Sequence, residues 1–198
     1  MSKNTRSFAA ALAAGAILFT AACSSDSDTA PAGTESASGA RSVIEPGEAN
    51  PMIAQGVEIS GDATVYKSSG LGPTALNEEA AEGSPESYID TEQFSGGTLP
   101  SGVTVTEAQG IGVLKKIRDN LEGQGYALED VVSMRVFLDN APGTDRADYA
   151  GWNRAYRQFF ANTNLDTDET ELVPMGTAEP AAPIERNSAR PSRFALEV

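Results

Sequence analysis

Apolar residues recur at helical spacing in a first stretch that begins at Thr106. Residues three or four positions apart lie on one face of a helix. The residues spaced in this way are Ile111, Leu114, Ile117 and Leu121. Thr106 with Gln109 three positions later resembles a capping box, and Gly123 and Gly125 supply a stop signal. We therefore predict an amphipathic helix from Thr106 to just before Gly123.

A second helical stretch, Asp145 to Phe160, carries an aromatic stripe. The stripe consists of Tyr149, Trp152, Tyr156, Phe159 and Phe160. Aromatic side chains at helical spacing are more often core residues than ligand contacts, so we interpret the stripe as packing.

Three further stretches have the composition of β-strands. Residues 52–69 are typical of a β-hairpin, in which Gly61-Asp62 forms the turn and residues 64–69 form the second arm. Residues 131–138 predict a buried strand, and residues 194–198 a short final strand. The predicted order is ββαβαβ, an α/β or α+β domain with its helices on one face of a sheet.

The remaining segments have little hydrophobic periodicity. Residues 24–50 are rich in Ser, Ala, Thr, Gly and Glu, a composition that does not bury enough apolar surface to fold. We expect a flexible tether over residues 23–50 and one domain over residues 51–198. Within that domain, residues 74–104 and 162–189 are expected to be long irregular loops.

The first 22 residues resemble a bacterial lipoprotein signal peptide. Lys3 and Arg6 precede an uncharged, Ala-rich run over residues 8–22, which suits a signal sequence better than a membrane span. Small residues lie directly before Cys23, whose sulfur would carry the lipid. We predict export and anchoring through Cys23 on the extracytoplasmic side of the membrane. The alternative is ordinary secretion with Cys23 unmodified.

Charge and composition exclude several classes of function. The chain has 198 residues and a net charge of −14, and cleavage before Cys23 would remove two basic and no acidic residues, leaving −16. Such a charge argues against nucleic-acid binding, which requires a basic surface. The absence of His excludes histidine-based catalysis and histidine metal ligands, and the single Cys excludes an internal disulfide. No carboxylate cluster has the spacing of a metal site.

Seven short motifs in the second part of the chain occur in the same order as in a known family. They are Gln55-Gly56-Val57; Ser69-Gly70; Gly97 to Pro100 leading into Glu107-Ala108-Gln109; Leu121 to Gly125 followed by Leu128 to Val132; Arg135 to Leu138; Asn153 to Phe160; and Arg190 to Arg193 followed by Glu197-Val198. Each motif alone is weak. Together they span roughly residues 50–198, and the chain resembles the Rid family, also called YjgF, of enamine/imine deaminases.

The resemblance implies a fold, an assembly and a reaction. It implies a chorismate-mutase-like α+β domain with helices on one face of a mixed sheet, and a homotrimer with ligand clefts between subunits. Family members hydrolyse enamines and imines of 2-amino acids to 2-oxo acids and ammonia, without a cofactor. By the same comparison, residues 74–96 and 162–189 would be insertions.

The resemblance also assigns candidate site residues. Arg193 matches the family's substrate arginine, and a planar guanidinium suits the bidentate binding of a carboxylate. Backbone groups near Gly70 and Ala195 would hold substrate and water, and Asn153 would lie near the pocket. The residues alone favour a surface arginine paired with Glu197 or a loop acid for Arg193, and a surface or capping amide for Asn153. We interpret Glu107, Asp130 and Asp139 as solvated surface acids.

Departures from the family pattern leave a second function open. Ile53 stands where compact members have a tyrosine, and Ala195 where many have a cysteine. Members also continue past the Glu-Val strand into a strand that carries a pocket carboxylate, so we expect the natural chain to extend beyond Val198. The alternative to a deaminase is a trimeric binding protein that holds a small carboxylate or a protein partner in the same cleft. A ribonuclease, the label of some relatives, is disfavoured by the charge.

Overall fold

The described part of the chain is an α+β fold. The computed structural model describes residues 39–177 and 179–198, so the predicted signal peptide, Cys23 and most of the predicted tether lie outside the described residues. The main elements are β1 (Ala40–Val43), β2 (Gly56–Ile59), α1 (Val105–Glu122), β3 (Ser133–Leu138), α2 (Tyr149–Arg157) and β4 (Ser192–Glu197). Three single-turn 3₁₀ helices add to these, η1 (Pro85–Tyr88), η2 (Ser95–Gly97) and η3 (Leu128–Asp130).

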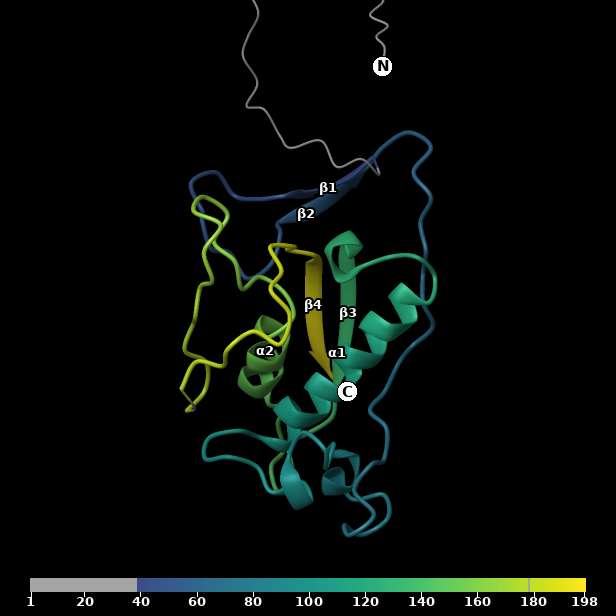
Figure 1. Ribbon diagram of the computed structural model, residues 1–198, viewed down its shortest axis with the longest axis vertical. Coiled ribbons are helices and arrows are strands. Elements are labelled where there is room, and N and C mark those ends of the chain that lie inside the picture. The colour runs from purple at the N-terminus through teal and green to yellow at the C-terminus, as the bar shows by residue number, and fades with distance from the viewer. Residues whose placement is uncertain (1–38, 178) are drawn as a thin grey trace, which may run out of the picture. The chain divides into compact units, whose positions relative to one another are not determined.

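The strands of the described residues form two separate two-stranded sheets, not the single mixed sheet that was expected (Figure 1). β3 and β4 are parallel, with Met134 opposite Arg193 and Phe137 opposite Leu196. β1 and β2 are antiparallel. The observed elements also follow the order ββαβαβ, but the first strand is Ala40–Val43, which was not predicted, and the predicted strand over residues 64–69 is absent from the described chain.

The predicted partner of β2 was wrong. β2 pairs with β1, which lies inside the range predicted as a tether, and Arg41 opposes Glu58 in an exposed ion pair. Residues 64–69 are exposed and form no strand. Their Tyr66 instead donates a hydrogen bond to Asn120 and stacks on Tyr126. Local β-propensity was therefore overridden by these side-chain contacts with the α1 region.

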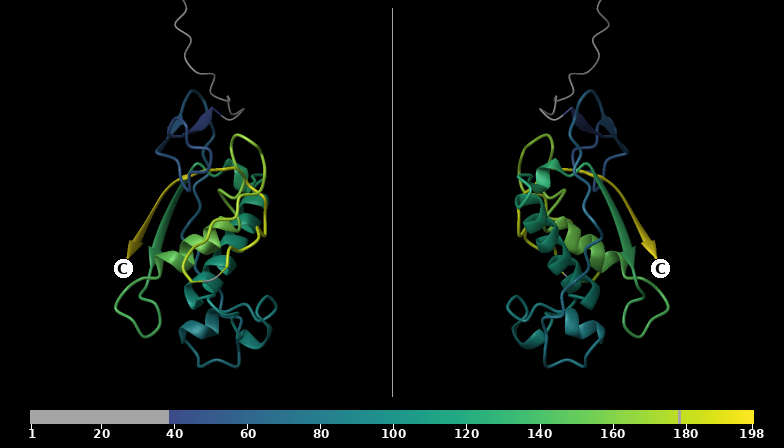
Figure 2. Two further views of the ribbon diagram at one scale, coloured as in Figure 1. Left: turned by 90° about the vertical axis from the view of Figure 1, so that its left-hand side faces the viewer. Right: turned by 90° about the vertical axis from the view of Figure 1, so that its right-hand side faces the viewer.

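Both helices cover one face of the β3–β4 sheet (Figure 2). Along β3, buried and exposed residues alternate, and Met134, Val136 and Leu138 join the hydrophobic core beneath the helices. The other face carries exposed apolar side chains, of which Phe137 is 62% and Leu196 50% exposed. One face of the sheet is therefore buried beneath the helices, and the other, open face is apolar and exposed to solvent.

Helix α1 begins one residue earlier than predicted. Thr104, not Thr106, is its cap: the Thr104 hydroxyl accepts a hydrogen bond from the backbone N–H of Glu107. Gln109 instead donates to the carbonyl of Pro85. The predicted apolar face is confirmed, since Ile111 and Leu114 are buried in the core. The predicted stop is also confirmed, with Gly123 as the C-terminal cap.

Helix α2 is shorter than predicted but carries the expected core. Asp148 caps it by accepting from the N–H of Gly151, so the helix begins at Tyr149 rather than Asp145. Four of the five aromatic residues are buried, namely Trp152, Tyr156, Phe159 and Phe160. Tyr149 is the exception and is exposed.

The two helices touch at a glycine. A Cβ on Gly110 would lie 2.9 Å from the Ala155 Cβ and 3.2 Å from a Trp152 ring carbon. Only a residue without a side chain lets α1 and α2 approach so closely.

None of the helices in the described ranges is long and apolar enough to cross a membrane.

Candidate functional site

Arg193 lies on β4 with its side chain on the helix-covered face of the sheet, because its partner across the ladder is the buried Met134. Its guanidinium carbon lies 4.3 Å from the centroid of the Tyr156 ring, a cation–π contact. Its Nη2 donates to Asn153 Oδ1 at 2.8 Å and lies 3.3 Å from the Met52 sulfur. The arrangement joins β4, α2 and the segment before β2.

The Arg193 guanidinium is only partly satisfied. Its Nε and Nη1 are shielded from solvent and have no hydrogen-bond partner in the part of the chain that the structure describes. No described carboxylate forms an ion pair with it either. Burial lowers its pKa from the ordinary arginine value, and the charge of Arg157 acts in the same direction. Two shielded donors without an acceptor on a half-buried cation are costly, so this position favours an external acceptor.

Arg193 is half-buried, and it does not form the ion pair with Glu197 that its interpretation as a surface arginine includes. Its expected partner Glu197 instead accepts a hydrogen bond from the backbone N–H of Ala147. Asn153 is likewise not a surface or capping amide, because its side-chain oxygen is committed to Arg193.

Two more buried arginines surround Tyr156, and sequence reasoning missed them. Arg157 Nη1 donates to Asn50 Oδ1 at 2.9 Å, and Arg190 Nε donates to the carbonyl of Pro51 at 3.0 Å. Burial lowers the pKa of both, and that of Arg190 falls to about 10. No ion pair to either is found among the described residues. No periodicity marks these two residues, because their partners Asn50 and Pro51 lie more than 100 positions away.

Arg157 and Arg190 hold residues 50–52 beside the site through their hydrogen bonds to Asn50 and Pro51. The Tyr156 hydroxyl also donates to the Met52 carbonyl, at 3.0 Å. The backbone of this segment is thus held firmly, whereas the Met52 side chain is flexible and its contact with Arg193 is weak. Asn50, which was expected to be the last residue of a flexible tether, is therefore part of the site.

The other predicted site residues are only partly brought together. Ala195 lies two residues along β4 from Arg193, on the same face, and packs against the core. Gly70 is exposed in the segment that runs beside α1, and no hydrogen bond among the described residues joins it to Arg193. Ile53 is 37% exposed. The described chain thus groups Arg193, Asn153 and Ala195, and leaves Gly70 apart.

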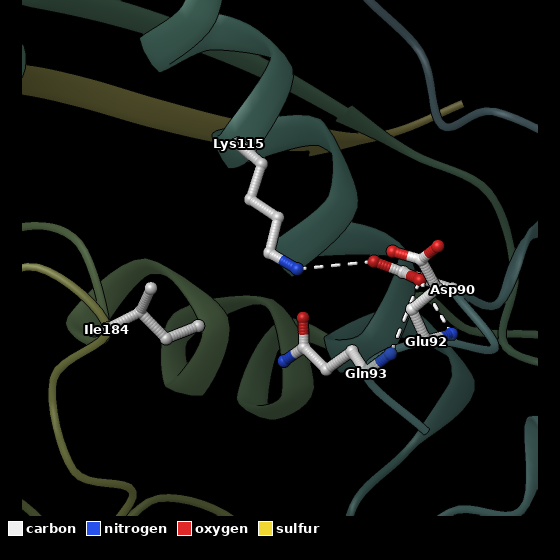
Figure 3. A pocket seen from close by; sticks show the side chains of 5 residues that line it. All are labelled: Asp90, Glu92, Gln93, Lys115 and Ile184. Atoms are coloured by element: carbon white, nitrogen blue, oxygen red, sulfur yellow. Dashed lines mark hydrogen bonds and ion pairs between the residues drawn. The ribbon is translucent and has the colours of Figure 1, made fainter. Parts of the chain in front are cut away.

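A surface hollow lies elsewhere, between α1 and the segments at Asp90 and Ile184 (Figure 3). It has a volume of about 390 Å³ and is lined by residues that do not contact Arg193. Lys115 donates to Asp90 Oδ2 at 3.2 Å across it. Burial of Asp90 raises its pKa, but the hydrogen bonds from Lys115 and from the backbone N–H groups of Glu92 and Gln93 lower it. The pKa of Asp90 is therefore lower than its ordinary value. In this hollow Lys115 and Asp90 are already paired with each other, and Gln93 Oε1 is buried without a partner among the described residues.

Of the three acidic residues that were predicted to be solvated on the surface, two are exposed and one is not. Asp130 and Asp139 are exposed and accept only local backbone hydrogen bonds, from Ala127 and Asn140. Glu107 was wrongly placed on the surface: it is 2% exposed and pairs with Arg154 and Gln158 of α2. Burial raises the pKa of Glu107 despite Arg154. No three potential ligands among His, Cys, Asp and Glu gather as a metal site within the described ranges.

The Arg193 site is suited to holding a small anion by hydrogen bonds and charge. It provides a fixed guanidinium, an amide that orients it and an aromatic ring beneath it. No known protein-family model matches the sequence, and a comparison with characterised proteins finds no match.

Proposed function

We propose that the chain is a Rid-like protein that hydrolyses small 2-imino or 2-enamine acids to 2-oxo acids and ammonia. The observation that carries the proposal is the guanidinium of Arg193, whose Nη2 is held by Asn153 and whose Nε and Nη1 are shielded from solvent without a partner among the described residues. These are two of the residues that the family resemblance selects. The α+β order of elements, with both helices on one face of β3–β4, supports the same assignment.

In this mechanism Arg193 binds and orients the substrate carboxylate. Each bidentate edge of a guanidinium contains Nη2, together with either Nε or Nη1, so a carboxylate would be bound by one of these two free donors and by the Nη2 N–H that contacts the Met52 sulfur. Holding the carboxylate places the adjacent C=N carbon for attack by water, which is catalysis by positioning. Because Nε and Nη1 are shielded in the single chain, entry requires displacement of a neighbouring side chain, and Met52 is the flexible one.

The test is hydrolysis of an imine produced in situ. An amino-acid oxidase acting on alanine supplies 2-iminopropanoate, and the loss of imine is followed with and without the full chain. We expect acceleration by the wild type, and a decrease of about tenfold or more for Arg193→Ala. Arg186→Ala, at an exposed arginine paired with Asp168, is the matched control. No acceleration over buffer, or equal rates for wild type and Arg193→Ala, would contradict the proposal.

A second candidate is a binding protein that uses the same site without turnover. Ile53 favours it, because an exposed apolar side chain stands where the resemblance expects a tyrosine hydroxyl. Titration calorimetry with pyruvate separates the two candidates. Binding that depends on Arg193, with no acceleration of imine loss, assigns the chain to this second class.

The assembly proposed with either function is a homotrimer. The open face of β3–β4 supports it, because Phe137, Phe194 and Leu196 form an exposed apolar patch on two adjacent strands. Patches of this kind mark interaction surfaces in soluble proteins.

The proposed location is the extracytoplasmic side of the membrane, with a lipid on Cys23. The support is the sequence of residues 1–23. Expression in a bacterial host, followed by fractionation, tests it: the wild type should partition with membranes and Cys23→Ser should not. Equal partition of the two proteins would contradict the anchor.

A further inference from the structure

A second cavity lies where the N-termini of α1 and α2 meet, away from the contacts of Arg193. Its volume is about 250 Å³. Thr104, the cap of α1, and Asp148, the cap of α2, both line it, together with Glu107 from the first turn of α1. Three oxygen-bearing side chains from two helices therefore share one cavity.

Two carboxylate oxygens in this cavity have no hydrogen-bond partner within residues 39–177 and 179–198. Glu107 Oε1 accepts from Arg154 and Gln158, but Glu107 Oε2 is buried and accepts from no described group. Asp148 Oδ1 accepts the cap hydrogen bond from Gly151, and Asp148 Oδ2 is likewise buried without a partner. An unpaired buried carboxylate oxygen costs free energy that a bound hydrogen-bond donor would recover.

The absence of a side chain at Gly151 leaves room for this cluster. A Cβ there would overlap both Asp148 Oδ2 and Thr104 Oγ1, which therefore lie close to the same point. The cavity thus presents three acceptors, two of them charged: Glu107 Oε2, Asp148 Oδ2 and a lone pair of Thr104 Oγ1.

The charge and the donor count define the ligand. Glu107 and Asp148 with Arg154 carry a net charge of −1, so a single positive charge neutralises the site. An ammonium group has three N–H donors, one for each acceptor. A divalent metal ion fits less well, because it needs six or more oxygen ligands and would lie beside the Arg154 guanidinium.

We propose that this cavity binds a small primary amine in its ammonium form. The volume exceeds what an ammonium ion alone requires, since a water molecule occupies about 30 Å³ in the liquid. Ala150 and Met175 line the remainder and would contact a short aliphatic body. This amine site uses none of the residues that contact Arg193. Its test is therefore independent of the test of the proposed function.

Calorimetric titration of the full chain with propylammonium chloride at constant ionic strength tests the amine site. Sodium chloride is the blank, and 1-propanol tests whether the charge matters. We expect saturable one-to-one binding of propylammonium and none of propanol. No saturable binding, equal binding of propanol, or displacement of the amine by equimolar Mg²⁺ or Ca²⁺ would overturn the proposal, and these comparisons require no variant.

Two variants locate the amine site. Asp148→Asn keeps an oxygen for the cap hydrogen bond from Gly151 but removes the charge, so we expect the affinity for propylammonium to fall about tenfold or more. Asp166→Asn makes the same change at an exposed position and should leave the affinity unchanged. Equal affinities of the wild type and Asp148→Asn would overturn the assignment. Thermal unfolding of both variants verifies that they are folded.

Discussion

At the scale of single residues, the informative groups are the charges that the fold buries. Arg157, Arg190 and Arg193 surround one tyrosine without an ion pair among the described residues, and Glu107 pairs with Arg154 across the helix interface. Burying a charge disfavours its ionised form, so each of these groups needs polar partners. Arg157 and Arg190 find theirs in Asn50 and in backbone carbonyls, whereas Arg193 finds one in Asn153 and retains donors for a ligand.

Glu107 predicts a specific pH dependence of stability. Its pKa is raised in the folded protein, mainly by burial, so the folded state binds this proton more tightly than the unfolded state does. Protonated Glu107 therefore contributes to the free energy of unfolding, in full at a pH below 4.5, the ordinary pKa of this side chain. This contribution is lost as the pH rises through the raised pKa of Glu107 in the folded protein. Glu107→Gln removes this titration.

Urea unfolding from pH 4 to pH 7 measures the effect as the free energy of unfolding of the wild type minus that of Glu107→Gln. We expect this difference to decrease with increasing pH. The matched control is Glu82→Gln at an exposed glutamate, which should follow the wild type. A difference that is constant or increases with pH would contradict the buried environment of Glu107.

The sequence led to Arg193 and Asn153 but not to Glu107 or the two other arginines. Family motifs selected the first pair, whose 2.8 Å contact the structure then provides. A glutamate in the first turn of a helix is usually solvated. The partner that buries Glu107 lies 47 positions later, on another helix, and no local pattern encodes that distance.

At the scale of elements, the contact between α1 and α2 depends on Gly110. Gly110→Ala raises helix propensity but places a methyl group against Ala155 and Trp152, so we expect destabilisation by about 1–2 kcal/mol. Gly112→Ala, on the same helix, meets nothing within 4 Å and should stabilise by about 0.5–1 kcal/mol. Chemical denaturation of both variants checks the pair. Stabilisation by Gly110→Ala would contradict the packing.

The helices and strands with a clear hydrophobic periodicity could be predicted from the sequence. The pairing of the short strands, which have little periodicity, could not. The buried face of α1 and the alternation of β3 follow from residue spacing. The partner of β2 does not, because β1 is four residues long and lies in a segment whose composition suits a tether. Its pairing is stabilised by hydrogen bonds and the Arg41–Glu58 ion pair, which leave little trace in a hydrophobicity pattern.

At the scale of the whole molecule, the open face of β3–β4 predicts self-association. Phe137→Asp places a charge in the centre of the proposed interface, and we expect it to convert a trimer to monomers in light scattering after size exclusion. Val65→Asp changes an equally exposed apolar residue in the segment beside α1 and should leave the assembly intact. A monomeric wild type, or a trimer that survives Phe137→Asp, would contradict this interface.

The claim that underlies both candidate functions is that Arg193 holds a small carboxylate. Calorimetric titration of pyruvate into the full chain, compared with Arg193→Lys and the control Arg186→Ala, measures it most directly. We predict saturable binding by the wild type and Arg186→Ala, and an affinity lower by about tenfold or more for Arg193→Lys, which keeps the charge but loses the planar pair of donors. Equal affinities of the wild type and Arg193→Lys, or no binding by the wild type, would contradict the account.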